Sequence, residues 1–257
     1  MKLFYRNFGA GQPLIVLHGL FGISDNWIPF GKLMAQKNFN VLIPDLRNHG
    51  QSPHSDIFDY QSMVQDLVNF INDNKIKNPI ILGHSMGGKI AMNYALENPL
   101  KVSKLIIVDV SLRTYTKKTH HIALANAMLS INFSIAKTRA DIEKQLLPEI
   151  SDKRIRNFLM KNIKRKNKSC YDWKINMESI YSNIDRVYEG INVESTFDGP
   201  TIFIRGGIST YVSEDDYLEI KKYFPNSKIH TIENASHWVQ VDAPDQFIAL
   251  IDGFIGV

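Results

Sequence analysis

One stretch constrains the fold of this chain more than any other, and it runs Ile80-Ile81-Leu82-Gly83-His84-Ser85-Met86-Gly87-Gly88. Its first three residues are apolar and predict a short buried strand, and the periodicity of residues 89–97 predicts a helix directly after it. A serine at such a strand-to-helix turn takes a strained backbone with positive φ, and small residues two places before and after it let strand and helix pass. Gly83 and Gly87 occupy those places. We therefore expect the Ser85 hydroxyl to project from the tip of a sharp turn.

Strand-like and helix-like segments alternate along most of the chain. Apolar runs rich in Val, Ile and Leu predict strands at residues 3–8, 13–18, 40–44, 80–82, 101–109, 200–205 and 227–232. Helical periodicity predicts helices at residues 27–37, 60–72, 89–97, 214–223 and 245–254. This alternation predicts an α/β fold, in which a mostly parallel sheet is covered by helices on both faces.

The alternation stops between the strands expected at 101–109 and 200–205. From Ser111 to about Thr196 the pattern is helical throughout. We therefore expect residues 111–197 to form a helical lid over the carboxyl ends of the strands, inserted into a core of residues 1–110 and 198–257. Apolar side chains of this lid are expected either to shape a substrate pocket or to form the core of the lid itself, and they are Tyr115, Phe133, Trp173, Met177 and Tyr181.

The composition is that of an ordinary globular protein, with 44% hydrophobic and 22% charged residues. No run approaches the ~18 apolar residues of a membrane span, and the first residues contain no apolar signal core. The single cysteine, Cys170, suits a reducing compartment and is expected in the core of the lid. We therefore expect a cytoplasmic protein without a membrane span.

Positive charge is concentrated in residues 151–170, which hold eight Lys and Arg residues, Lys168 among them, against one acid. This segment carries a net charge of +7, which leaves −3 for the rest of a chain whose total is +4. Such a patch could serve a nucleic acid or a membrane surface. We favour a solvated helix face, because Ile155, Phe158, Leu159 and Ile163 form an apolar stripe at helical spacing. No nucleic-acid partner is expected.

Four motifs follow one another along the chain, and they are His18-Gly19-Leu20-Phe21-Gly22, Asp45-Leu46-Arg47-Asn48-His49-Gly50-Gln51-Ser52, Gly83-His84-Ser85-Met86-Gly87-Gly88 and Ala235-Ser236-His237-Trp238. In this order they resemble the motifs of the α/β-hydrolase superfamily, and most of all those of its small carboxylesterases. The resemblance covers nearly the whole chain, and the lid is where such families diverge. The sequence has no metal-ligand cluster and no GxxxxGK phosphate loop, so we expect no metal and no cofactor.

Ser85 requires a base, because a serine hydroxyl is a poor nucleophile until its proton is removed. His237 is the last of eight histidines and lies in a short loop after the strand expected at 227–232. That loop lies at the same edge of a parallel sheet as the Ser85 turn, and the position suits the order serine, acid, histidine. We expect His18 and His84 to be structural. The other five are expected on the surface or in loops, and they are His49, His54, His120, His121 and His230.

The acid that orients His237 is harder to assign. Many relatives in the superfamily carry it in a Gly-x-x-Asp turn after the lid, but the corresponding turn here, residues 206–211, has no carboxylate. Asp109 ends the strand that follows the Ser85 turn and would point to the same edge of the sheet, although such an Asp can instead cap the next turn. Asp109 is therefore our first choice. Glu178 is the runner-up, followed by Asp215 and Asp216.

An acyl-transfer site also needs donors for the oxyanion of its tetrahedral intermediate. The backbone N–H of Met86 lies at the positive end of the expected helix. The N–H of Leu20, in the glycine-flanked loop after His18, is the expected second donor. Phe21 and Trp238 are expected to join the lid residues Trp173, Met177 and Tyr181 in lining the substrate pocket. Three further residues are expected to tie neighbouring loops together, and they are Asp45, Arg47 and Ser52.

The sequence therefore predicts a serine hydrolase that cleaves a small-molecule carboxylic ester, or an acyl thioester, through an acyl-serine intermediate. One alternative is a small-ligand receptor or scaffold of the same fold with little turnover. Another is hydrolysis of a carbon–carbon bond, or perhydrolysis, by the same three residues.

Overall fold

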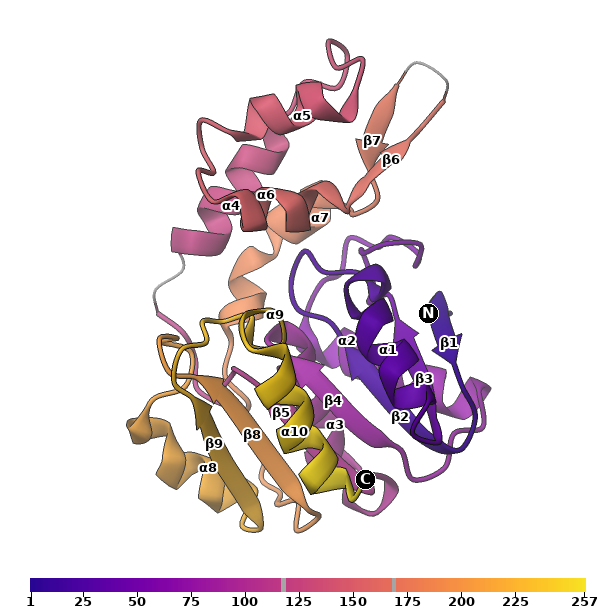
Figure 1. The fold of residues 1–257 in the computed structure, drawn as a ribbon, viewed down its shortest axis with the longest axis vertical. Coiled ribbons are helices and arrows are strands. Elements are labelled where there is room, and N and C mark those ends of the chain that lie inside the picture. Colours follow the sequence, from indigo (N-terminus) through magenta and orange to yellow (C-terminus); the bar gives the residue numbers. More distant parts are fainter. Residues whose placement is uncertain (117–118, 168–169) are drawn as a thin grey trace.

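The computed structural model describes residues 1–116, 119–167 and 170–257, and a seven-stranded sheet forms its centre (Figure 1). In the order β1-β3-β2-β4-β5-β8-β9, only the β1–β3 pair is antiparallel. The strands are β1 (Tyr5–Phe8), β2 (Gln12–Leu17), β3 (Phe39–Pro44), β4 (Ile80–His84), β5 (Lys104–Val108), β8 (Thr201–Gly206) and β9 (Ser227–Ile232). The predicted α/β fold with a mostly parallel sheet is confirmed.

Helices cover both faces of this sheet because its strands are apolar on both sides. Alternate strand residues separate into two buried clusters: Leu14 and Val16 pack against α1 and α10, whereas Ile15 and Leu17 pack with α2, α3 and α8. These helices are α1 (Ile28–Ala35), α2 (Tyr60–Asp73), α3 (Met86–Glu97), α8 (Tyr217–Tyr223) and α10 (Pro244–Ile255).

Several boundaries differ from those expected. β5 begins at Lys104 instead of residue 101, because Pro99–Lys101 form a 3-10 turn, η2. The 3-10 turns η1 (Ser24–Trp27) and η4 (Glu214–Asp216) precede α1 and α8, and the loop after His237 contains a short helix, α9 (Val239–Asp242). These are local adjustments, and they leave the order of the main elements unchanged.

Residues 111–197 connect β5 to β8 and stand over the edge of the sheet at which these strands end (Figure 1). We call this part of the chain the inserted segment. Its described elements are α4 (Thr119–Leu129), α5 (Arg139–Leu146), α6 (Lys153–Met160), β6 (Ile163–Arg165), β7 (Tyr171–Trp173), α7 (Met177–Ser182) and η3 (Ile184–Tyr188). None of the helices in the described ranges is both long enough and apolar enough to cross a bilayer.

The expectation that this segment is helical throughout was wrong, because β6 and β7 form an antiparallel hairpin with Ile163 opposite Trp173. Buried and less buried residues alternate in β7, as they do in strands, with Tyr171 and Trp173 buried on either side of Asp172. Ile163 therefore belongs to a strand and not to the expected helical stripe. Lys168 lies outside the described residues.

The basic helix α6 is only partly a solvated face. Lys153 and Arg154 are exposed, but Arg156 is buried and donates to the carbonyl oxygens of Ile150 at 2.9 Å and Ser151 at 2.8 Å. Arg156, expected at the surface, thus holds the backbone of residues 150–151 that precede α6.

Candidate active site

The backbone at Ser85 has the strained conformation that the sequence pattern predicts. Its φ is 54° and its ψ is −121°, and its N–H donates to Val108 O at 3.0 Å. A Cβ atom added at Gly83 would lie 2.4 Å from Gly87 O, and one added at Gly87 would lie 2.4 Å from Leu17 O. No larger residue fits at either place, so the two glycines allow β4 and α3 to meet at Ser85.

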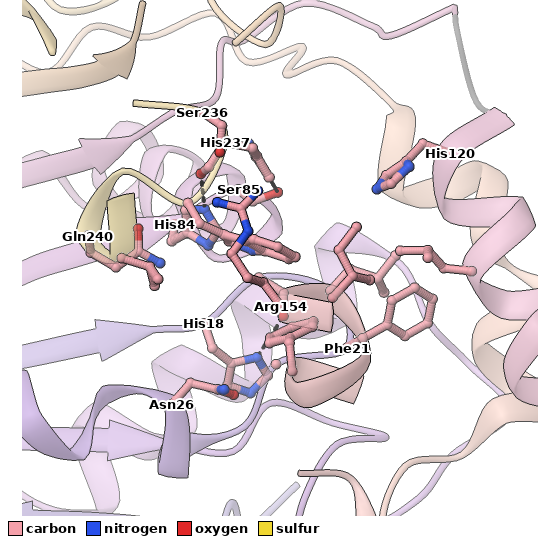
Figure 2. A pocket seen from close by; sticks show the side chains of 18 of the residues that line it. His18, Phe21, Asn26, His84, Ser85, His120, Arg154, Ser236, His237 and Gln240 are labelled. Atoms are coloured by element: carbon pink, nitrogen blue, oxygen red, sulfur yellow. Dashed lines mark hydrogen bonds between the residues drawn. The ribbon is translucent and has the colours of Figure 1, made fainter. Parts of the chain in front are cut away.

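Three side chains from three loops meet at this turn, and His237 is the middle one (Figure 2 shows His237 beside Ser85). His237 Nε2 lies 3.0 Å from Ser85 Oγ, and His237 Nδ1 lies 2.8 Å from Asp109 Oδ2. A proton on Nδ1 satisfies the carboxylate and leaves Nε2 free to accept from the serine hydroxyl. The geometry is that of a nucleophile, a base and an orienting acid.

Asp109 is held from two sides. Its Oδ1 accepts from Gly206 N at 2.9 Å, and its Oδ2 accepts from Ser209 Oγ as well as from His237. The turn at 206–211, which lacks the carboxylate common in the superfamily, therefore supplies two donors to a carboxylate that comes from β5. Asp109 itself has a φ of 47°.

The other candidate acids lie elsewhere. Glu178 is exposed on α7, Asp215 is exposed in η4, and Asp216 is buried in an ion pair with Arg113 at 2.9 Å.

The segments that carry the two expected oxyanion donors both lie close to Ser85. Met86 is the first residue of α3, and the loop of Leu20 approaches so closely that a Cβ at Gly19 would lie 3.1 Å from Ser85 Cβ. Within the described ranges, neither the Leu20 nor the Met86 N–H donates to a protein acceptor. Both groups are thus available to a negatively charged oxygen.

Two buried histidines hold the loop that carries Leu20. His18 donates from Nδ1 to Gly19 O at 2.9 Å and accepts at Nε2 from Leu46 N at 3.0 Å. His49 donates from Nδ1 to Arg47 O at 2.8 Å and accepts at Nε2 from Phe21 N at 3.3 Å. Burial lowers the pKa of His18 to about 4, and burial and the nearby His18 lower the pKa of His49 to about 3. Both rings therefore stay neutral.

His49 lies in a loop, as expected, although its side chain is buried. The surface or loop position expected for His121 was wrong, because His121 lies on α4 and is buried. His84, expected to be structural, donates from Nε2 to the backbone oxygen of His237 at 2.9 Å. Burial and the nearby His237 lower the pKa of His84 to about 3. A neutral His84 can hold the His237 loop without repelling a positive charge on the His237 ring.

These neutral histidines predict a loss of stability in acid. Below pH 6.5 the unfolded chain protonates them while the folded chain does not, so the free energy of unfolding falls as the pH drops toward about 4. Each such group adds about 1.4 kcal/mol per pH unit to this slope. We expect His49→Gln, which keeps an acceptor for the Phe21 N–H, to reduce the pH dependence of the free energy of unfolding by about one histidine's contribution. Urea unfolding between pH 6 and 4.5 measures this slope. The exposed His54→Gln is the control, and parallel slopes for His49→Gln and wild type would contradict the prediction.

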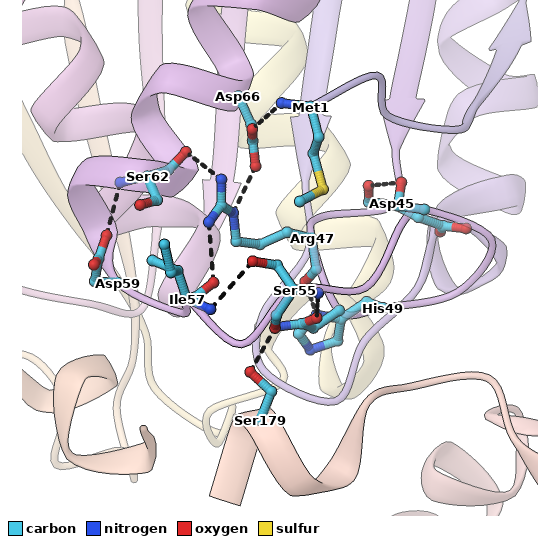
Figure 3. A network of polar contacts seen from close by, with 12 residues as sticks. Met1, Asp45, Arg47, His49, Ser55, Ile57, Asp59, Ser62, Asp66 and Ser179 are labelled. Carbon is cyan, nitrogen blue, oxygen red and sulfur yellow. Dashed lines mark hydrogen bonds and ion pairs between the residues drawn. The ribbon is translucent and has the colours of Figure 1, made fainter. Parts of the chain in front are cut away.

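The loops beside the site are tied by polar contacts (Figure 3). Arg47 Nε contacts Asp66 Oδ2 at 2.6 Å, and Asp45 accepts from the backbone N–H of Ser24 at 2.6 Å and of Gln51 at 2.8 Å. Ser52 Oγ accepts from Phe4 N at 2.9 Å. Asp45, Arg47 and Ser52 thus connect loops, as expected.

A cavity of about 570 Å³ opens in front of Ser85 (Figure 2). The core supplies one wall, with Phe21 and Trp238 among its side chains. The inserted segment supplies another, with Leu124 and His120 from α4 and Ile155 and Phe158 from α6.

Three of the expected pocket residues are not in this lining. Trp173 packs edge-on against Phe133, with 5.5 Å between ring centroids. Met177 is buried in the hydrophobic core and Tyr181 is 40% exposed. The expectation that they line the pocket was therefore wrong, whereas the alternative, that they belong to a core, holds for Trp173 and Met177. The lining comes from α4 and α6 instead. The apolar stripe of α6 was visible in the sequence, but its direction was not.

Comparison with known proteins agrees with this fold. Residues 12–244 match the family described as the alpha/beta hydrolase fold. The chain belongs to this family. It is 37% identical over 252 residues to the sn-1-specific diacylglycerol lipase ABHD11 of Danio rerio, covering 96% of this chain and 79% of that protein. It is 29% identical over 250 residues to esterase YbfF of Escherichia coli, covering 97% and 95%. A solved structure of a marine microorganism esterase matches with a TM-score of 0.95, 41% identity and 99% coverage of both chains.

Proposed function

We propose that Ser85, His237 and Asp109 carry out the reaction of this chain, which is a serine ester hydrolase. The relatives just described are named esterases and a lipase. The observation that carries the proposal is the continuous series of contacts from Ser85 Oγ through both nitrogens of His237 to Asp109.

In the first half of the reaction, Ser85 Oγ attacks the ester carbonyl carbon while His237 Nε2 takes the hydroxyl proton. The carbonyl oxygen becomes an oxyanion and accepts from the N–H groups of Leu20 and Met86. When the intermediate collapses, the bond to the alcohol breaks, and His237 gives its proton to the departing oxygen. Asp109 stabilises the imidazolium ion that exists between these two transfers.

In the second half, His237 takes a proton from water as the water oxygen attacks the acyl carbon. The second tetrahedral intermediate releases the carboxylic acid, and the proton returns to Ser85 Oγ. Every proton that is removed is thus returned within one cycle.

The cavity favours esters with an apolar acyl chain. Its wall includes apolar side chains from both the core and the inserted segment, among them Phe21, Leu124, Ile155, Phe158 and Trp238. Because α4 and α6 cover the cavity from above, we propose that the inserted segment acts as a lid. The name of one relative, a diacylglycerol lipase, makes acyl esters of glycerol the first compounds to test, and the name esterase of another supports carboxylic esters in general.

Steady turnover separates the proposed hydrolase from a receptor of the same fold. We expect p-nitrophenyl acetate and butyrate to be hydrolysed linearly with time over many equivalents of enzyme, and a fluorophosphonate to label Ser85 and stop the reaction. A burst of about one equivalent followed by a stall would instead support the receptor. A panel of diacylglycerols and acyl thioesters then ranks the substrates.

We also propose that the protein acts in the cytoplasm. Cys170, the single cysteine, is free, which suits a reducing compartment.

A further inference from the structure

An aromatic ring that belongs to none of the three reacting residues lies flat against His237. The rings of Tyr211 and His237 have centroids 3.9 Å apart and planes inclined by 20°. This is the geometry of stacked rings. Tyr211 also lines the cavity, and it follows the turn after β8 whose Gly206 and Ser209 hold Asp109. One short stretch of chain therefore contacts both the proposed acid and the proposed base.

Tyr211 is itself fixed from several directions. Its backbone N–H donates to Ser209 Oγ at 3.2 Å, and its carbonyl oxygen accepts from Tyr115 Oη at 2.8 Å. Its hydroxyl lies 3.4 Å from Nε2 of the buried His121 on α4. Burial raises the pKa of Tyr211 to about 12, so its ring carries no charge at neutral pH. The ring is thus uncharged, and Tyr211 is held by a hydrogen bond to Ser209 of the core and by a contact with His121 of the inserted segment.

The two hydrogen bonds of His237 leave one of its motions open. Contacts at Nδ1 and Nε2 fix the imidazole along the line from Asp109 to Ser85, but they do not oppose tilting of the ring about that line. A parallel ring in van der Waals contact with its face does oppose it. His237 also contacts the carboxylate of Asp109 and lies beside the neutral ring of His84, whose centroid is 4.8 Å away with planes inclined by 40°.

The stack also suits the charge that forms during the reaction. When His237 takes the Ser85 proton it becomes a cation, and the face of an aromatic ring attracts a cation. An aliphatic side chain of similar size would fill the space without this attraction. The effect belongs to the transition state and not to substrate binding, and it therefore bears on kcat.

We propose that Tyr211 is a positioning residue, whose ring holds the imidazole of His237 in the plane in which it serves both Ser85 and Asp109. The inference rests on the proposed role of His237 as the base. It concerns the ring of Tyr211, and the hydroxyl serves only to anchor that ring to His121.

The test compares Tyr211→Leu with Tyr211→Phe in the full chain, using p-nitrophenyl butyrate. We expect Tyr211→Leu to lower kcat about tenfold, the rate equivalent of one good aromatic contact, with KM changed by less than about twofold. Tyr211→Phe keeps the ring and should retain kcat within about threefold. The rate of Ser85 labelling by a fluorophosphonate should follow kcat in both variants, because that reaction needs the base but not the acyl pocket.

A matched control is Tyr217→Leu. Tyr217 lies on α8, outside the cavity lining; its ring is half-buried and its hydroxyl lies 3.2 Å from Arg205 Nη1. This substitution should leave kcat unchanged. The proton of His237 on Nδ1 gives a separate readout by NMR: we expect its downfield resonance to be sharp in wild type and Tyr211→Phe and to broaden or vanish in Tyr211→Leu. Should Tyr211→Leu unfold, Tyr211→Met tests the same loss of the ring.

Three results would overturn the inference. They are an unchanged kcat in Tyr211→Leu and Tyr211→Met, a rise in KM alone, and a loss in Tyr211→Phe as large as in Tyr211→Leu. An unchanged kcat would mean that Tyr211 does not affect the reaction, and a rise in KM alone would mean that it only contributes to substrate binding. An equal loss in Tyr211→Phe would assign the effect to the hydroxyl. A wild-type level of activity in Ser85→Ala would instead refute the proposed function, so the two failures are distinguishable.

Discussion

Replacing Ser85 with alanine is expected to lower kcat for p-nitrophenyl butyrate by about four to six orders of magnitude, as loss of a nucleophile does in hydrolases of this kind. The side chain is nearly buried, with 6% exposed, and alanine removes only the oxygen that contacts His237 Nε2 at 3.0 Å. The positive φ of 54° remains a cost for alanine as it is for serine. The loss should therefore be chemical and not structural.

Thermal unfolding of Ser85→Ala checks that the fold survives, and the midpoint should stay within a few degrees of wild type. Ser227→Ala is the matched control, because Ser227 is also buried and its hydroxyl has no partner among the residues that the structure describes. It should keep full activity. Turnover by Ser85→Ala within tenfold of wild type would remove the acyl-serine intermediate from consideration.

Replacing Asp109 with asparagine is expected to lower kcat by about 10³- to 10⁴-fold. The amide oxygen would remain on Gly206 N, which now donates to Oδ1 at 2.9 Å, and the amide nitrogen would then face His237 Nδ1. Because the amide nitrogen is a donor, it favours the His237 tautomer that has its proton on Nε2. In that tautomer Nε2 cannot accept the proton of the Ser85 hydroxyl. The imidazolium would also lose its neighbouring negative charge.

Glu178→Gln tests the competing assignment under the same assay. Glu178 is exposed on α7, so its replacement should change neither kcat nor the unfolding midpoint. If Glu178→Gln abolished turnover in a folded protein while Asp109→Asn did not, the acid would have to be reassigned to α7 and the structure around His237 would have to rearrange.

The parts of the site that could be predicted are those fixed by neighbours in the sequence or by the rules of parallel sheets. The Ser85 turn follows from a strand, two glycines and a helix in immediate succession. Asp109 follows from register, since β4 and β5 pair in parallel with His84 opposite Val108, which brings the next residue of each strand to the same edge. His237 lies in the loop that follows β9 at that same edge.

The parts that could not be predicted depend on contacts between distant segments. The side of α6 that faces the cavity is set by how α6 packs on the rest of the inserted segment, and periodicity alone shows only that a helix has an apolar side. His49 is polar and lies in a glycine-containing loop, and its burial goes with hydrogen bonds to Phe21 N and Arg47 O that the sequence does not reveal. Trp173 was misplaced because the hairpin of β6 and β7 gave no strong signal in so few residues.

The proposed reacting residues belong to the core, whereas part of the cavity wall belongs to the inserted segment, and this separation bears on how substrate specificity can evolve. The proposed reacting residues Ser85, Asp109 and His237 lie on turns and loops of the core, with Met86 beginning α3 beside them. Leu124, Ile155 and Phe158 reach the cavity from the inserted segment, which leaves and re-enters the core between the adjacent strands β5 and β8. Substitutions in the inserted segment can therefore change the shape of the cavity without replacing any of the proposed reacting residues. Proteins with this architecture can therefore change their substrate specificity while they keep the same reacting residues.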